Sequence, residues 1–203
     1  MRRQEFQCQD LAEFDWIAQH GRVGHLGLID SSGFPRIVPL NFVAFNRHIY
    51  FHGALDGEKF EVFRSQPQVT FSIAIPYSTI PSYWIAKDYA CPATTYFKSL
   101  HIRGQGAIAE DMAEKATALQ AFMEKYQPEG GYRPISCNEP MYEKPLQKVA
   151  VFRIDSLQID IKAKFGQNLS PKVRLELIAK LEARNQATDQ QTADEIRRTL
   201  IAS

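Results

Sequence analysis

The sequence predicts a mainly β fold with flanking helices, built on an antiparallel meander. Between residues 22 and 71, apolar and polar residues alternate in short runs of strand length. The runs are separated by turn-forming residues, first Asp30-Ser31-Ser32-Gly33 and then Asn46-Arg47, and residues 36–45 between these turns predict a single strand. The run at residues 48–52 is aromatic and β-branched, as is typical of a half-buried strand. Together these observations indicate consecutive antiparallel strands joined by short turns.

A helix is predicted on each side of this meander. Before it, residues 11–20 carry apolar side chains at helical spacing, Asp10 can act as the N-cap, and Gly21 can end the helix. After it, residues 112–126 carry a second apolar stripe, and Pro128 follows it. Both patterns indicate amphipathic helices that bury one face.

Three further strands and one long loop are predicted along the rest of the chain. Residues 68–75 are an apolar-rich run that predicts a strand ending at Pro76. Residues 77–95 lose periodicity and are rich in aromatic residues, so they predict a long loop. We expect this loop to act either as a lid over a ligand pocket or as a dimer-contact arm. Residues 96–110 and 149–161 alternate again and predict two more strands.

The carboxyl-terminal segment predicts two helices. Ser170 as N-cap and Pro171 at the first helical position begin one of them, and the other is predicted over residues 192–201. Two short helices raise the alternative of a helix-turn-helix that binds DNA. Acidic residues in this segment nearly cancel the basic ones, whereas a nucleic-acid footprint is concentrated and basic. We therefore expect a solvated helical appendage or a dimer-stabilising tail.

Composition restricts the classes of function. The chain has 203 residues and a formal net charge of +1, so it has no general attraction to nucleic acid or to anionic membranes. No apolar run approaches the roughly twenty residues of a membrane-spanning helix. The amino end lacks the apolar core of a secretory signal, so a cytoplasmic protein is expected.

The cysteines and histidines predict no metal site. The three cysteines, Cys8, Cys91 and Cys137, are widely spaced and fit free thiols. No pair of histidines has the spacing of a zinc motif.

The strand at residues 48–52 leads into a loop that suits a phosphate. Gly53 and Gly57 precede Lys59, which stands at the start of a short amphipathic helix. A helix N-terminus presents unpaired backbone amides, so a lysine beside it favours a bound phosphate. His52, between the strand end and this loop, is the histidine expected to contact a ligand. The absence of a catalytic triad, a paired-carboxylate site or a Walker loop argues against a hydrolytic enzyme.

Three segments of this region occur in a distinctive order: VPLNF at residues 38–42, IYFHGALDGEK at residues 49–59 and PQVTF at residues 67–71. Their order and spacing resemble the FMN-binding split-barrel family related to pyridoxamine 5'-phosphate oxidase, in particular its nitroimidazole-resistance-like branch. The resemblance covers roughly residues 5–126.

This resemblance implies an antiparallel split β-barrel domain over residues 1–163 and a helical appendage over residues 164–203. It also implies FMN as a non-covalent cofactor and a homodimer with the flavin sites at the subunit interface. The residues implied near the cofactor are Val38, Pro39, Leu40 and Asn41 along the isoalloxazine ring, His52 and Gly53 beside the flavin, and Lys59 on its phosphate.

Two later segments extend the resemblance. Residues 96–110 are similar to the family's Y-x-S-V-x-x-x-G-x-A strand, and this match would bring Ser99 and Lys98 to the flavin phosphate. Lys98 and Arg103 could instead be solvated charges on the barrel surface, and for Arg103 we favour that interpretation. The segment KAKFGQN at residues 162–168 is similar to the carboxyl-terminal signature of flavin-binding transcriptional regulators of the PaiB type.

The family resemblance implies an oxidoreductase. A nicotinamide nucleotide or another donor would reduce the bound FMN, which would pass hydride or electrons to a small acceptor such as a nitro compound, a quinone or a pyridoxal-type molecule. The chain lacks a counterpart of the arginine- and histidine-rich carboxyl-terminal motif of the true oxidases, so activity on pyridoxine compounds is not expected. The alternatives are a flavin-binding transcriptional regulator, a haem-handling split barrel, an F420-dependent relative and a dimer that binds no chromophore.

Overall fold

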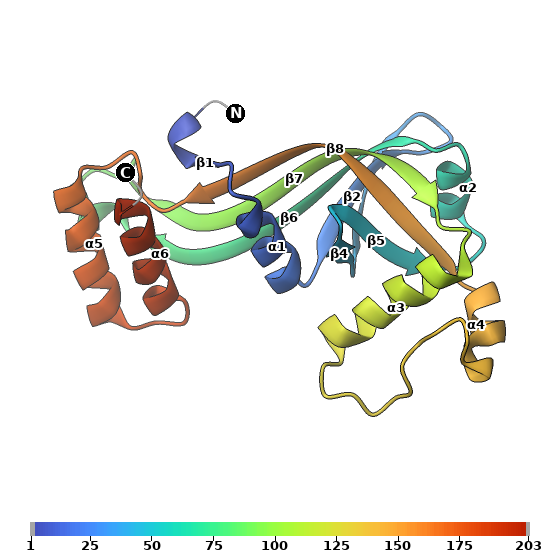
Figure 1. Cartoon of the computed structure of the whole chain (residues 1–203). Helices are drawn as coiled ribbons and strands as arrows, with labels where there is room; N and C mark the ends of the chain where they lie inside the picture. The colour runs from blue at the N-terminus through green and yellow to red at the C-terminus, as the bar shows by residue number, and fades with distance from the viewer. Residues whose placement is uncertain (1–2, 202–203) are drawn as a thin grey trace. The chain divides into compact units, whose positions relative to one another are not determined.

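One antiparallel β-sheet, accompanied by helices, organises the chain and confirms the predicted fold class (Figure 1). The computed structural model describes residues 3–201. Within these residues the strand order is β3-β2-β6-β7-β8-β5-β4, and β1 pairs with β8. The strands are β1 (Gln7–Cys8), β2 (Gly24–Ile29), β3 (Pro35–Leu40), β4 (Val43–Phe45), β5 (His48–Gly53), β6 (Gln68–Ile80), β7 (Thr94–Ile108) and β8 (Ala150–Lys164). The α-helices are α1 (Leu11–His20), α2 (Glu58–Arg64), α3 (Met112–Tyr126), α4 (Glu143–Gln147), α5 (Pro171–Arg184) and α6 (Asp189–Ile201).

The chain divides into two compact units. Unit 1 contains the residues up to Glu13, residues 74–100 and the residues from Asp160 onward. Unit 2 contains residues 14–73 and 101–159. The long strands β6, β7 and β8 therefore contribute residues to both units, and each unit is described by itself below.

Alternating strand residues and an aromatic cluster form the core of unit 2. In β2, Leu26 and Leu28 are buried, as the alternating pattern predicts. The ring of Phe51 on β5 lies 5.3 Å from that of Phe63 on α2 and 4.8 Å from that of Phe152 on β8, measured between centroids. Buried aromatic rings contribute large apolar areas and favour such stacked and edge-on contacts. Phe63 thus anchors α2, the short helix that follows the two loop glycines, to the sheet.

Helices α1 and α3 have the bounds that the sequence predicts, and each begins at a capping aspartate. The Asp10 carboxylate accepts a hydrogen bond from the Ala12 amide at 2.9 Å, and the Asp111 carboxylate accepts one from the Glu114 amide at 2.9 Å. Each cap satisfies a backbone N–H that has no partner inside the helix.

The single strand predicted over residues 36–45 is wrong, because the structure divides it into β3 and β4. At the break, the Phe42 carbonyl accepts hydrogen bonds from Lys125 Nζ at 2.9 Å and from the Tyr126 hydroxyl at 3.0 Å. Side chains of α3 thus replace the strand partner at this position, which local sequence patterns do not reveal.

The strand predicted to end at Pro76 continues as β6 to Ile80, so that prediction is wrong as well. The pairing of β2 with β6 ends at Ser72, and a proline beyond this point breaks no hydrogen bond to β2. The predicted loop at residues 77–95 is correspondingly shorter, since both its ends are strand and Ser82–Trp84 forms a 3-10 helix. The role of this loop as a lid or a dimer arm stays a prediction.

Helices α5 and α6 pack side by side in unit 1 (Figure 1). The Ser170 hydroxyl accepts a hydrogen bond from the Val173 amide at 3.5 Å and Pro171 is the first helical residue, as predicted. The second helix begins at Asp189 rather than at Thr192. Their apolar faces share a core with strand residues, which comprises Ile80, Tyr96, Ala163, Phe165, Leu177, Ile178, Leu181, Ala193 and Ile196. The domain boundary predicted after residue 163 stays a prediction.

Among the helices of residues 3–201, none combines the length and the hydrophobicity that a membrane-spanning segment needs. Over the same described residues, histidine, cysteine and acidic side chains form no cluster of three that could ligate a metal ion.

Candidate functional site

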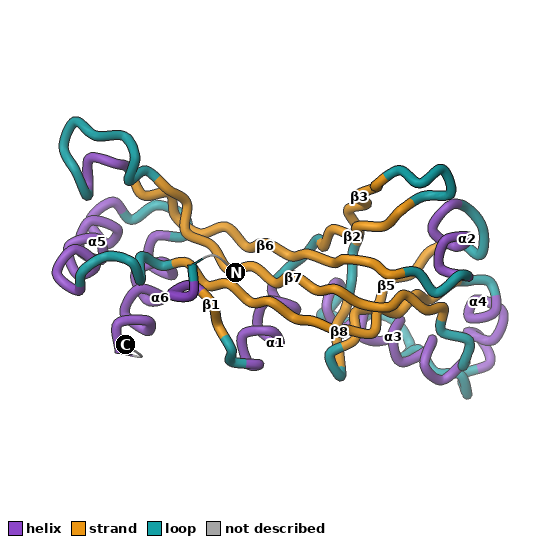
Figure 2. Tube along the Cα trace, turned by 90° about the horizontal axis from the view of Figure 1, so that it is seen from above, coloured by secondary structure: helices purple, strands orange, loops and turns teal. Residues whose placement is uncertain are grey.

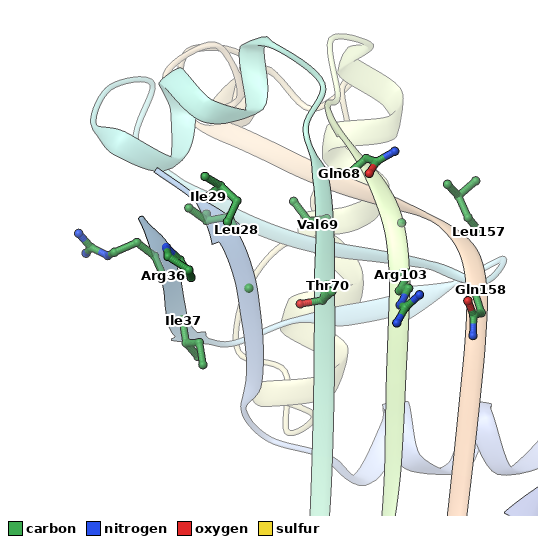
Figure 3. A pocket seen from close by; sticks show the side chains of 13 residues that line it. Leu28, Ile29, Arg36, Ile37, Gln68, Val69, Thr70, Arg103, Leu157 and Gln158 are labelled. Carbon is green, nitrogen blue, oxygen red and sulfur yellow. The ribbon is translucent and has the colours of Figure 1, made fainter. Parts of the chain in front are cut away.

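A groove of about 610 Å³ crosses the sheet face of unit 2 (Figure 3). Its lining comes from β3, β2, β6, β7 and β8, which follow one another in this order in the sheet (Figure 2). Figure 3 shows Arg36 and Ile37 at one side, Thr70 in the middle, and Arg103 and Leu157 at the other side. A volume of this size is within the range of small-molecule sites.

The register of the strands aligns three of the residues that line the groove. Gly27 on β2 lies opposite Ile37 on β3 and opposite Thr70 on β6, so the three residues form one row across the sheet. A side chain at position 27 would collide with the Thr70 hydroxyl. The Thr70 hydroxyl thus takes the space that the missing side chain of Gly27 leaves.

The charges along the groove favour an anion. Arg36 pairs with Glu58 of α2 at 3.3 Å, and Arg103 makes no hydrogen bond or ion pair within residues 3–201. No lining residue within these described residues is acidic. A guanidinium without a carboxylate partner is a natural ligand for phosphate or carboxylate oxygens.

The loop predicted to hold a phosphate brings Gly53 and Lys59 together. Gly57 has φ of +86° and directly precedes α2, so the chain turns there in a conformation that favours glycine. A Cβ atom placed on Gly53 would lie 4.0 Å from Cε of Lys59. Lys59 also neighbours Glu58, the partner of Arg36, so a lysine and an arginine flank the start of α2.

His52 lies beside this loop with its ring against α3. Its centroid is 4.9 Å from that of Phe122 in an edge-on contact. Partial desolvation against α3 lowers the pKa of His52, which favours the neutral imidazole. A neutral ring can donate one hydrogen bond and accept another, which suits orientation of a bound heterocycle.

The predicted residues Val38, Pro39, Leu40 and Asn41 continue β3 directly beyond Arg36 and Ile37. The Asn41 amide donates a hydrogen bond to the Arg22 carbonyl at 3.1 Å, which fixes the chain where β3 ends. Neither this segment nor any other predicted cofactor residue is among the described residues that line the groove. The groove and the sequence prediction thus involve the same part of the chain, but the groove is lined by residues 35–37, whereas the prediction names residues 38–41.

The other two predicted residues, Lys98 and Ser99, belong to unit 1. Lys98 is 1% exposed, and its Nζ lies 2.6 Å from Glu195 and 3.1 Å from Glu13. Consecutive strand residues point to opposite faces, and the burial of β7 alternates accordingly. One phosphate therefore cannot contact both side chains, and Lys98 is not the solvated surface charge offered as its alternative role. Arg103 is exposed, as expected.

Sequence reasoning overlooked Gly27, Arg36 and Thr70, and it treated Arg103 only as a surface charge. The alternation of β2 places Gly27 on the solvent face, where a missing side chain is a usable signal. Arg36 stands two residues before the VPLNF segment, but only the strand register shows that it and Arg103 share a groove.

Comparison with protein-family models gives a match over residues 10–163 to the family described as pyridoxamine 5'-phosphate oxidase. The chain belongs to the pyridoxamine 5'-phosphate oxidase family. The resemblance inferred from the VPLNF, IYFHGALDGEK and PQVTF segments is thereby confirmed. A search of curated proteins returns no match.

Several solved structures share the fold of this chain. A proposed 5-nitroimidazole antibiotic resistance protein from Bacteroides thetaiotaomicron is 24% identical, with a TM-score of 0.61 over 77% of this chain and 85% of that chain. A flavocytochrome from Azotobacter vinelandii is 19% identical, with a TM-score of 0.63 over 78% and 69% of the two chains. An FAD- and haem-binding protein from Mycobacterium smegmatis is 13% identical, with a TM-score of 0.63 over 79% and 74%. These likenesses establish the split-barrel fold.

Proposed function

We propose that this protein binds FMN in unit 2 and transfers hydride or electrons through it to a small acceptor, such as a nitro compound or a quinone. The observation that carries the proposal is the family match over residues 10–163. Two of the similar structures described above are a flavocytochrome and an FAD- and haem-binding protein, which supports a flavin as the cofactor. A nicotinamide nucleotide is the proposed electron donor.

The residues of unit 2 fit an anionic, planar cofactor. The groove has apolar walls, two arginines and no acidic lining residue within residues 3–201. Gly53, which carries no side chain, lies close to Lys59. An isoalloxazine ring with a phosphate requires these properties, namely an apolar surface for the ring and a cation for the phosphate.

Each residue has a proposed role in holding the cofactor. Lys59 binds the phosphate, and neutral His52 with Gly53 orients the flavin. The backbone of residues 38–41 lies along the ring, and Ser99, which belongs to unit 1, is given no role in this site. Lys98 is left out of the site, because its charge already belongs to two buried carboxylates. Bound FMN supplies the redox chemistry, while the protein binds, orients and shields it.

We also propose that the protein forms a homodimer, on the basis of exposed apolar side chains at the groove. Ile37 is 74% exposed and Leu157 is 71% exposed, and both lie at the groove. Large apolar side chains in such exposure are typical of surfaces that another chain covers. Light scattering of the purified protein tests this: a dimer mass is expected, and a monomer at all concentrations contradicts it.

Substitution of Lys59 tests the proposed phosphate contact. Lys59→Ala should weaken FMN binding by about 1.5–3 kcal/mol, roughly tenfold to a hundredfold in Kd, because it removes a charge-assisted contact. The measurement is titration of FMN by fluorescence quenching. Lys144→Ala on α4 is the matched control, since Lys144 is an exposed lysine of the same unit and should leave the affinity unchanged. Equal affinities of wild type and a folded Lys59→Ala variant would remove Lys59 from the site.

A further inference from the structure

A second cavity, distinct from the groove, lies wholly within unit 1. Its volume is about 570 Å³. Its lining includes Arg3, Phe6, Cys91, Tyr96, Lys162 and Lys164. The two lysines belong to the KAKFGQN segment, which the proposed flavin site does not use.

Three cations converge on this cavity. Lys162 and Lys164 are alternate residues of β8, so they share one face of the strand, and both are half-buried. Lys162 Nζ stands 5.7 Å from the centroid of the Phe6 ring. Lys164 Nζ donates to the Thr94 hydroxyl rather than to a carboxylate. Lysines held at such depth are uncommon without an acidic partner.

Acidic residues are present around these cations but do not line the cavity. Glu5 lies 3.7 Å from Arg3, in an exposed pair, and Asp160 precedes Lys162 on the same face of β8. Within the described residues the lining itself has no carboxylate. Burial lowers the pKa of Lys164, and the nearby charges of Lys162 and Arg3 lower it further, so the positive charge is incompletely balanced.

A buried tyrosine and an apolar wall complete the lining of the cavity. Tyr96 is 1% exposed, and its hydroxyl has no hydrogen-bond partner within residues 3–201. A side chain at Gly166 would collide with that hydroxyl, so the glycine at this position makes room for Tyr96. Phe6 and Leu169 give the cavity an apolar surface.

We propose that this cavity is a nucleotide-binding site, with the phosphates on Lys162, Lys164 and Arg3 and the base against its apolar wall. A nucleotide combines the two properties that the cavity offers, a cluster of unbalanced cations and an apolar aromatic surface, in a volume that suits it. The site lies in unit 1 and does not depend on FMN binding in unit 2.

Calorimetric titration with ADP, in protein already saturated with FMN, tests the proposal apart from the flavin site. Saturable binding is expected for the wild type, and Lys162→Gln and Lys164→Gln should each weaken it by about tenfold, as loss of a charge-assisted contact does. Lys172→Gln is the matched control, since Lys172 is an exposed lysine of unit 1 outside the cavity. Absence of saturable binding, or equal weakening by the control, overturns the proposal.

Cys91 reports where the nucleotide binds. It is an exposed thiol that lines the cavity, whereas Cys137 is an exposed thiol of unit 2. ADP should slow alkylation of Cys91 and leave the rate at Cys137 unchanged, as measured by mass spectrometry. Binding without protection of Cys91 places ADP elsewhere and overturns the proposal. Inorganic phosphate should compete only weakly; if it displaces ADP at equal concentration, the cavity recognises phosphate alone and the assignment to a nucleotide is wrong.

Discussion

Lys98 of unit 1 and Lys125 of unit 2 are both buried, and their surroundings accommodate the charge differently. In unit 1, Lys98 lies between the carboxylates of Glu13 and Glu195. In unit 2, Lys125 is 7% exposed and donates to the carbonyls of Ala18 and Phe42 at 2.8 and 2.9 Å, with Nζ 3.7 Å above the Phe42 ring. No carboxylate pairs with it within the described residues.

The difference shows two ways to keep an amine inside a protein. Arg198 also contacts Glu13 at 2.7 Å and Glu195 at 2.8 Å, so unit 1 holds a compact group of two acids and two bases. Every charge in this group depends on the others. In unit 2, burial, and then the nearby Arg22, lower the pKa of Lys125 to about 7. The charge of Lys98 is thus balanced by two carboxylates, whereas Lys125 is partly deprotonated near neutral pH.

Removal of Lys98, the lysine paired with carboxylates, should lower the stability more than removal of Lys125. Lys98→Met keeps the length of the side chain but leaves Glu13 and Glu195 with less positive charge in a buried site. We expect the free energy of unfolding to fall by about 3–5 kcal/mol, as when one partner of a buried ion pair is lost. Urea unfolding followed by circular dichroism measures it.

An exposed ion network of the same unit provides the comparison for Lys98. Arg197 pairs with Glu182 and Asp194 on the surface. Arg197→Met should cost no more than about 1 kcal/mol, since exposed pairs contribute little. Similar losses for the two variants would show that the buried group is no more important than a surface pair.

Lys125 should make the stability of the protein depend on pH. The pKa of Lys125 is lowered from 10.5 to about 7, so between these values the unfolded chain binds a proton that the folded chain lacks. Stability should therefore rise with pH from about 7 to about 9, by up to about 1.4 kcal/mol per pH unit. Lys125→Met removes this contribution and should flatten the dependence.

The readout is the difference between wild type and variant in urea unfolding at several pH values, because other groups titrate in both. Lys148 is an exposed lysine of the same unit, so Lys148→Met should keep the wild-type slope of unfolding free energy against pH. If the unfolding free energy of wild type and Lys125→Met changed equally with pH, Lys125 would stay charged throughout, stabilised by the Ala18 and Phe42 carbonyls and the Phe42 ring.

Local patterns predicted the elements whose signals lie within a few residues. The caps at Asp10 and Ser170 gave the starts of α1 and α5, and the apolar stripe of residues 112–126 gave α3. The VPLNF and IYFHGALDGEK segments indicated the family, which the match over residues 10–163 confirms. Capping and strand alternation are short-range effects, so a single sequence carries them.

Long-range contacts escaped prediction. The partners of Lys98 come from residues 13 and 195, and the break at Phe42 depends on Lys125 and Tyr126. The groove joins Arg36 and Arg103 through strand register alone. None of these pairings has a local signal, because only the folded sheet brings the residues together.

The most direct test of the proposed function is the absorption spectrum of the purified protein, followed by titration with FMN. Bound FMN should appear as flavin bands, or added FMN should be quenched saturably at one site per chain, as the apolar groove and the cations of unit 2 require. A colourless protein that leaves the fluorescence of FMN unchanged would contradict the flavin-dependent oxidoreductase, and a Soret band in its place would assign the barrel to haem.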